Sequence, residues 1–245
     1  MRYLYAPLGS AVLLISCGLA QSGGDDGRAV VAKAIQAIGG EANLAKFKAY
    51  TVKDKGKYYG MGDGQPYNGV MTVQHPGQLR MEIEGVFTMI VNGDKGWIQA
   101  GGQTIDMKPE QIAAQKVDRS ASLIIALWPL KDKAFQLKPL DDAKVGKHHA
   151  SVVQVTRKNY PDVKLYFDKT SNLLIKAAYR NHSQEANKVV EVELFFSEFR
   201  AVEGVKMPHK LALKHDGKLF VESETVSMKA HDKLDAKTFA KPAAE

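Results

Sequence analysis

The sequence predicts a mainly β (α+β) fold in which a long antiparallel sheet curls into a barrel or a half-barrel. From Tyr50 onward, short segments that alternate apolar and polar residues follow one another, the pattern of half-buried strands. Turn residues separate almost all of them, in a chain with 21 glycines and nine prolines. Ten or more consecutive antiparallel strands must curl, because strand twist accumulates and a flat sheet would leave its apolar face in water.

The N-terminal residues predict export. Met1 and Arg2 precede an apolar run over residues 8–15 and then small residues, so residues 1–20 are expected to be a secretory signal peptide. Residues 14–17 resemble a bacterial lipobox, in which Cys17 would be acylated, whereas cleavage after Ala20 would leave Gln21 first. The protein is therefore expected in the periplasm or cell envelope, either soluble or lipid-anchored through Cys17, its single cysteine.

A flexible leader and a first helix are expected after the signal peptide. Residues 21–27 read as a flexible polar leader, and residues 28–245 as one domain, because no linker composition interrupts them. Residues 29–38 have apolar positions at helical spacing, and Gly39 and Gly40 supply the stop. A short helical turn is expected over residues 41–47.

A first series of strands follows the helices. In the third of them Leu79, Met81 and Ile83 alternate with polar residues, so one face is apolar and the other polar. The predicted strands are residues 52–59, 67–74, 79–84, 87–91 and 97–100.

Two short helices are then expected between the strands. Pro109 suits the first helical position before residues 110–116, and Ser120 is a possible N-cap for an apolar piece over residues 121–130. That piece is too short to cross a membrane, so it should be buried by the sheet or by something held in the sheet.

A second series of strands completes the domain: residues 135–138, 151–157, 163–168, 173–180, 189–199, 207–215 and 219–228. Pro208 lies at the start of one of them. Proline cannot donate a ladder hydrogen bond, so its place favours a sheet with an unpaired edge nearby over a sealed barrel.

Charge and motifs exclude several function classes. The net charge of +7 comes from singly spread lysines, which does not favour nucleic-acid binding and allows weak attraction to anionic lipid surfaces. His148 and His149 would point to opposite faces of a strand, so they do not form a metal site. No linear motif of a hydrolase, metalloprotease or nucleotide-binding protein occurs, and we expect no catalysis, metal or cofactor.

Several stretches together resemble the LolA/LolB-like superfamily of periplasmic carriers and receptors for outer-membrane lipoproteins. They are "GVMTVQHPGQLRMEIEGVFTMIVNGDKGW", "SASLIIAL", "KLYFDKTSNLLIKAAY", "VVEVELFFSEFRAV" and "DAKTFAKP". The resemblance implies an incomplete, strongly curved antiparallel β-barrel whose concave apolar face, covered or plugged by short helices, shelters acyl chains. Two features depart from the family: His75 stands where the carriers have an arginine before the turn proline, and residues 201–228 look like an added pair of strands. His75 is thus either an ordinary turn residue or a cargo-sensing one.

These observations predict a non-enzymatic, exported binder or carrier of the acyl chains of a lipid or lipoprotein, working near a membrane surface. The alternative is an envelope sensor or scaffold that binds a protein partner and fills its interior with its own helix. Each predicted ligand-binding residue could equally be ordinary core. They are Leu79, Met81, Ile83, Trp97, Leu123, Ile124, Leu127, Trp128, Leu165, Ile175 and Phe196.

Overall fold

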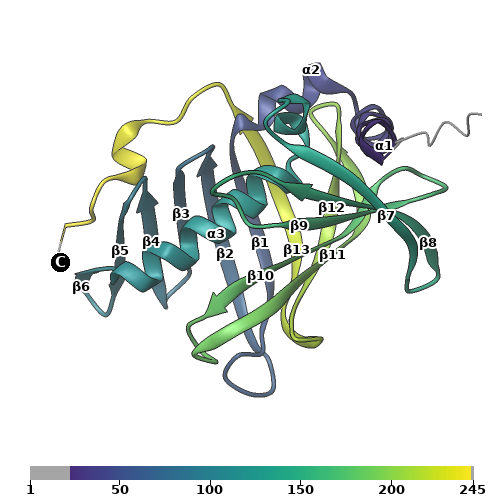
Figure 1. Ribbon diagram of the computed structural model, residues 1–245. Coiled ribbons are helices and arrows are strands. Elements are labelled where there is room, and N and C mark those ends of the chain that lie inside the picture. Colours follow the sequence, from purple (N-terminus) through teal and green to yellow (C-terminus); the bar gives the residue numbers. More distant parts are fainter. Residues whose placement is uncertain (1–22, 244–245) are drawn as a thin grey trace, which may run out of the picture.

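The structure, a computed structural model, describes residues 23–243, so the predicted signal peptide and Cys17 lie outside the described residues. A single antiparallel sheet of 13 strands dominates it (Figure 1), in the order β6-β5-β4-β3-β2-β1-β13-β12-β11-β10-β9-β8-β7. The end strands β6 and β7 do not pair with each other, so the sheet is curved but open. This confirms the predicted incomplete barrel.

The first six strands form one half of the sheet. They are β1 (Ala49–Tyr58), β2 (Gln65–Gln74), β3 (Gln78–Ile83), β4 (Phe87–Asn92), β5 (Lys95–Ala100) and β6 (Gln103–Asp106). The others are β7 (Gln136–Val145), β8 (His148–Thr156), β9 (Val163–Asp168), β10 (Leu174–Ser183), β11 (Lys188–Val202), β12 (Val205–His215) and β13 (Lys218–His231). The short strand β6 was not predicted, and β7 is longer than expected.

Within residues 23–243, three α-helices and three 3₁₀ turns accompany the sheet. They are α1 (Gly23–Ala37), α2 (Glu41–Leu44), η1 (Ala45–Lys48), α3 (Pro109–Ile125), η2 (Trp128–Lys131) and η3 (Ala236–Phe239). Helix α1 begins at Gly23, so residues expected in the flexible leader are helical. Helix α1 approaches β7 closely at Gly27, where a Cβ atom would lie 2.5 Å from the carbonyl oxygen of Leu137.

Helix α3 is continuous, and the predicted break before Ser120 is wrong. Ser120 lies inside the helix and does not cap it. Asp118 and Arg119, the two residues before Ser120, are part of the same helix and bind other parts of the chain. Pro109 does occupy the first turn, as predicted.

The position of Pro208 is explained by a split inside the sheet. Residues Val205–Pro208 of β12 pair with β11, whereas pairing of β12 with β13 begins only at Lys210. Beyond Glu224, β13 pairs with β1 alone. Pro208 therefore has a strand on one side only, which is the edge-like environment that its missing N–H requires.

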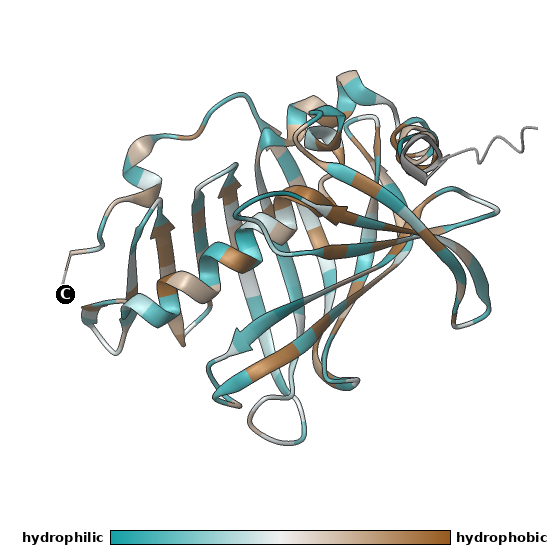
Figure 2. Cartoon of the chain, viewed as in Figure 1, coloured by the Kyte–Doolittle hydropathy of each residue, from teal (hydrophilic) through white to brown (hydrophobic). Residues whose placement is uncertain are grey.

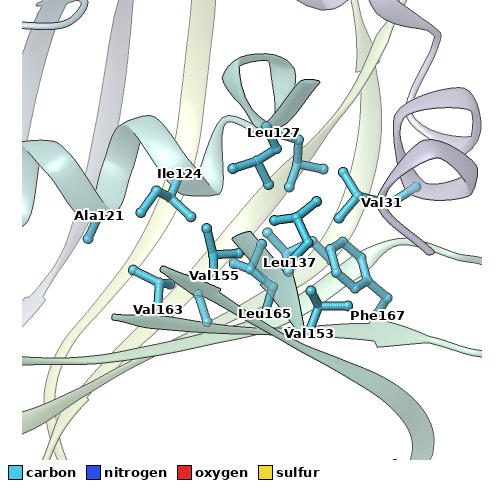
Figure 3. Close-up of a cluster of buried hydrophobic side chains, with 14 of the residues drawn as sticks. Val31, Ala121, Ile124, Leu127, Leu137, Val153, Val155, Val163, Leu165 and Phe167 are labelled. Carbon is cyan, nitrogen blue, oxygen red and sulfur yellow. The ribbon is translucent and has the colours of Figure 1, made fainter. Parts of the chain in front are cut away.

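The hydrophobic core fills the half of the molecule that contains β7–β11. Apolar residues of these strands pack against α1 and the C-terminal end of α3 (Figures 2 and 3). Ile124 and Leu165 are fully buried there, and Figure 3 shows the side chains of Val31, Leu137 and Phe167 converging on the same cluster.

Candidate functional site

The middle of the sheet carries a half-buried apolar surface on its concave side. Strand pairing places the side chains of β3 opposite those of β2, and those of β11 opposite those of β12, all on the face that α3 crosses. We call it the central inner surface, and its members are Val52, Met71, Leu79, Met81, Ile83, Leu194, Phe196, Met207, Leu211, Leu213, Val221 and Met228. All of them retain contact with solvent, although they lie on interior strands.

Helix α3 is held over the concave side by polar contacts at both of its flanks. Asp118 accepts hydrogen bonds from the hydroxyl of Tyr179 and from the side-chain amide of Asn181, both at 2.8 Å. On the other flank, the guanidinium of Arg119 donates to the carbonyl oxygens of Gly77 and Gly93, the latter at 2.9 Å. Burial raises the pKa of Asp118, and the hydrogen bonds from Tyr179 and Asn181 oppose this effect.

One end of the central inner surface is closed by aromatic side chains. Tyr50, at the start of β1, lies opposite Val73 and Ala230. Its ring centre is 6.0 Å from that of His75, which in turn is 6.4 Å from that of Trp128. The ammonium of Lys48 lies 5.3 Å from the centre of the Trp128 ring. We call Lys48, Tyr50, His75 and Trp128 the Trp128 cluster.

Titration in the Trp128 cluster is strongly affected by burial. Burial lowers the pKa of His75 to about 4, so its imidazole is neutral at pH 7. Burial also raises the pKa of Tyr50 to about 12, with a hydrogen bond to Ser122 acting in the opposite direction. At pH 7 the only formal charge in this cluster is the ammonium of Lys48.

The opposite end of the central inner surface is polar. The hydroxyl of Tyr67 donates to Asp54 at 2.9 Å, and burial raises the pKa of this carboxyl. Nearby, the hydroxyl of Tyr58 on β1 donates to Glu185 in the turn between β10 and β11, at 3.4 Å. This contact joins segments that are 127 residues apart in the chain.

No protein-family model and no curated protein matches the sequence, but solved structures do. A LolA superfamily protein from Nitrosomonas europaea matches 88% of this chain and 97% of its own, with 13% identity and a TM-score of 0.56. A domain assigned to outer membrane lipoprotein sorting, from Vibrio parahaemolyticus, matches 81% and 95%, with 10% identity and a TM-score of 0.52. The chain has a LolA-like fold. A DUF1329 family protein from Desulfovibrio piger covers 89% of this chain and 98% of its own, with 11% identity and a TM-score of 0.58.

The LolA-like sheet divides the predicted ligand-binding residues into groups. Four of them, Leu79, Met81, Ile83 and Phe196, lie on the central inner surface, and Trp128 lies at its aromatic end. Others are core: Leu123, Ile124, Leu127 and Leu165 are at most 5% exposed. Ile175, also buried, lies outside the main core cluster at an irregularity in the pairing of β9 and β10.

Trp97 was predicted to face the cavity, and this is wrong. Gly96 faces α3, because a Cβ atom there would meet the side chains of Met107 and Ile112, so Trp97 points to the outer face. That face is covered by the C-terminal segment, in which Ala243 accepts a hydrogen bond from the side chain of Gln99 at 2.9 Å.

Several members of the site were not identified from the sequence. Met71 and Met228 belong to strands whose alternation is recognisable, but nothing local shows that the strand of Met228, β13, adjoins β1. The contacts of Asp118 and Arg119 depend on partners far away in the chain, so no local pattern could have revealed them.

A hollow of about 670 Å³ lies elsewhere, on the outer side of β7–β9. Lys138, Leu140, Lys164 and Tyr166 are among the residues that line it. None of the predicted ligand-binding residues contributes to this hollow, so it is separate from the central inner surface.

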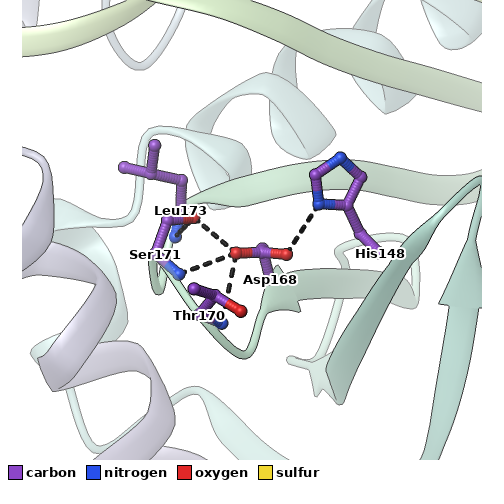
Figure 4. Close-up of polar contacts among 5 residues, drawn as sticks. All are labelled: His148, Asp168, Thr170, Ser171 and Leu173. Carbon is purple, nitrogen blue, oxygen red and sulfur yellow. Dashed lines mark hydrogen bonds and ion pairs between the residues drawn. The ribbon is translucent and has the colours of Figure 1, made fainter.

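A cluster of His148, Asp168 and Ser171 contains the residue types of a hydrolase triad but not its geometry (Figure 4). Asp168 accepts from the Ser171 hydroxyl at 2.7 Å and lies 2.9 Å from Nδ1 of His148. The serine therefore binds the carboxylate and not the imidazole, which leaves it without a general base. Asp168 also accepts from the backbone N–H groups of Thr170 and Ser171, so its role is to hold this turn.

Two further observations concern residues 23–243 only. No three His, Cys, Asp or Glu side chains among them are grouped closely enough to hold a metal ion. None of their helices is both long enough and apolar enough to span a bilayer.

Proposed function

We propose that the protein is an exported, non-enzymatic binder or carrier of acyl chains, from a lipid or a lipoprotein, and that these chains lie on the central inner surface. One observation carries this proposal. Leu211 and Leu213 belong to an interior strand, where the inner face of a sheet is normally packed, yet both remain half-buried. A hydrocarbon chain is the ligand that such a surface suits.

The hydrophobic effect sets the scale of this binding. Each methylene group that moves from water onto an apolar surface gains about 0.8 kcal/mol when it is fully buried. The side chains of the central inner surface offer no charged group, so the length and shape of the chain should dominate affinity. Polar contacts are confined to the two ends of this surface.

The cargo class and location are supported by two independent lines. The sequence begins with the pattern of a signal peptide, and the similar Vibrio parahaemolyticus domain is assigned to outer membrane lipoprotein sorting. An acylated Cys17 would make the protein a tethered receptor, and cleavage after Ala20 would make it a mobile shuttle. The mass of the mature N-terminus distinguishes these two forms.

A pair of matched substitutions on β2 tests the proposal. Met71 belongs to the central inner surface, whereas the adjacent Val70 points to the outer face. Met71→Trp should fill the binding surface and weaken uptake of a fluorescent fatty-acyl probe at least tenfold, while Val70→Trp should leave it unchanged. Equal effects of the two variants, or no uptake by the wild type and no lipid in native mass spectra, would contradict the proposal.

One observation favours the alternative, an envelope sensor or scaffold with a self-filled interior. The half that contains β7–β11 is already packed by α1 and α3. In that case Trp128→Ala would cost roughly 3–5 kcal/mol of unfolding free energy, the value for a buried tryptophan. In a carrier the same variant would stay folded and lose affinity for acyl chains.

A further inference from the structure

The Trp128 cluster brings four side chains from separate segments to one end of the central inner surface. Lys48 ends η1, Tyr50 begins β1, His75 belongs to the β2–β3 turn and Trp128 begins η2. The ring distances of 6.0 and 6.4 Å show that Tyr50, His75 and Trp128 form one continuous contact. A chain lying on the central inner surface would have one of its ends here.

Trp128 contributes a hydrogen-bond donor that has no acceptor. Its Nε1 atom is buried, and no acceptor lies within hydrogen-bond distance among residues 23–243. A buried indole N–H normally finds a partner, because leaving it unpaired costs free energy. A ligand oxygen would supply the missing acceptor.

Lys48 contributes a positive charge next to this donor. Its ammonium lies 5.3 Å from the centre of the Trp128 ring, on an exposed and flexible side chain. Within the described part of the chain Lys48 has no ion-pair partner, and His75 beside it is neutral at pH 7. The charge is therefore available to an anionic group of the ligand.

The backbone that presents Trp128 is strained. Leu127 has a φ of 63°, in the left-handed region that a branched residue rarely adopts. The buried Leu127 side chain, which packs into the core, holds this conformation in place. Strained backbone of this kind concentrates at sites that bind ligands.

We propose that Trp128 and Lys48 bind the anionic end of an acyl-chain ligand, a carboxylate or a phosphate, while its hydrocarbon chain lies on the central inner surface. The Trp128 N–H donates a hydrogen bond to one ligand oxygen, and the Lys48 ammonium swings off the indole ring to pair with the charge. This inference rests on the proposed function and adds selectivity for the polar end of the ligand.

Three ligands that share a twelve-carbon hydrocarbon chain test the proposed anionic site: dodecanoate, dodecyl phosphate and dodecanol. We expect the wild-type protein to bind at least one of the anions about tenfold more tightly than the alcohol in titration calorimetry at pH 8. A preference for dodecanoate would point to free fatty acids, and one for dodecyl phosphate to phospholipids. Equal affinity for all three overturns the anionic site alone, whereas no binding of any of them overturns the proposed function as well.

Variants then assign the preference to named groups. Trp128→Phe keeps the ring but removes the N–H, and Lys48→Met keeps the apolar stem but removes the charge. Each should reduce the preference for the anion several-fold with little change for dodecanol, and Lys48→Met should also weaken the dependence on salt. Trp97→Phe, on the outer face, is the matched control.

Because Lys48 is exposed, Lys48→Met preserves the test if Trp128→Phe fails to fold. An unchanged anion preference in folded Lys48→Met overturns the proposed role of the charge. An unchanged preference in folded Trp128→Phe overturns the role of the N–H.

Discussion

Acidification should destabilise the protein through His75. The imidazole has its ordinary pKa of 6.5 in the unfolded chain, whereas burial lowers it to about 4 in the folded protein. Between these values the unfolded state binds a proton that the folded state does not. The unfolding free energy therefore rises with pH in this window. The stabilising contribution is complete above pH 6.5 and is lost as the pH falls toward 4.

The size of this effect follows from the two pKa values. They differ by about 2.5 pH units, which corresponds to a loss of about 3 kcal/mol of unfolding free energy if His75 were completely shielded from water. His75 is only partly buried, so water screens it and roughly 2 kcal/mol is the expected loss between pH 7.5 and pH 4.

Urea unfolding of the wild type and His75→Gln across this pH range measures the effect directly. Other groups also titrate here, including His215, whose pKa is lowered by burial, so the difference between the two proteins is the relevant quantity. That difference should change by roughly 2 kcal/mol. The reasoning would be refuted if the unfolding free energies of the two proteins changed with pH in parallel. An NMR titration of His75 with a midpoint near 6.5 would also refute it.

Four other substitutions test the remaining structure. Ile124→Ala should cost about 2–5 kcal/mol of unfolding free energy, whereas Met81→Ala on the half-buried surface should cost about 1.5 kcal/mol or less; equal losses would contradict the contrast between core and open surface. Asp118→Ala leaves Tyr179 without its acceptor and should cost about 1–3 kcal/mol in chemical denaturation, so a loss below about 0.5 kcal/mol would argue against the anchoring of α3. Trp97→Phe should bind the acyl probe with an affinity within about twofold of the wild type. A larger change in fluorescence titration would indicate that Trp97 lies on the binding face after all.

The sequence was sufficient for features that depend on local periodicity. The alternation of Leu79, Met81 and Ile83 places all three on one face wherever the strand lies, because the side-chain period of a strand is two. The same rule places Trp97 on the face opposite Gly96, but the sequence does not show which face is concave. The contact of the C-terminal segment with the outer face at Gln99 is a tertiary one, so no local pattern reports it.

Long-range contacts account for the remaining differences between the sequence-based predictions and the structure. Asp118 and Tyr179 are 61 residues apart, so no local pattern shows that they are partners. The unpartnered N–H of Trp128 is likewise a property of the packed structure alone. The split between β12 and β13 was only suggested by Pro208, because a proline near a strand start is compatible with many sheets.

NMR of the methionine methyl groups tests the central claim most directly. Met71, Met81, Met207 and Met228 lie on the central inner surface, whereas Met61 is 78% exposed in the β1–β2 loop. Titration of methyl-labelled protein with a twelve-carbon acyl ligand should shift the signals of those four methionines and leave that of Met61 in place. Unchanged signals from all four, at ligand concentrations where binding is saturated, would contradict binding of the chain on this surface.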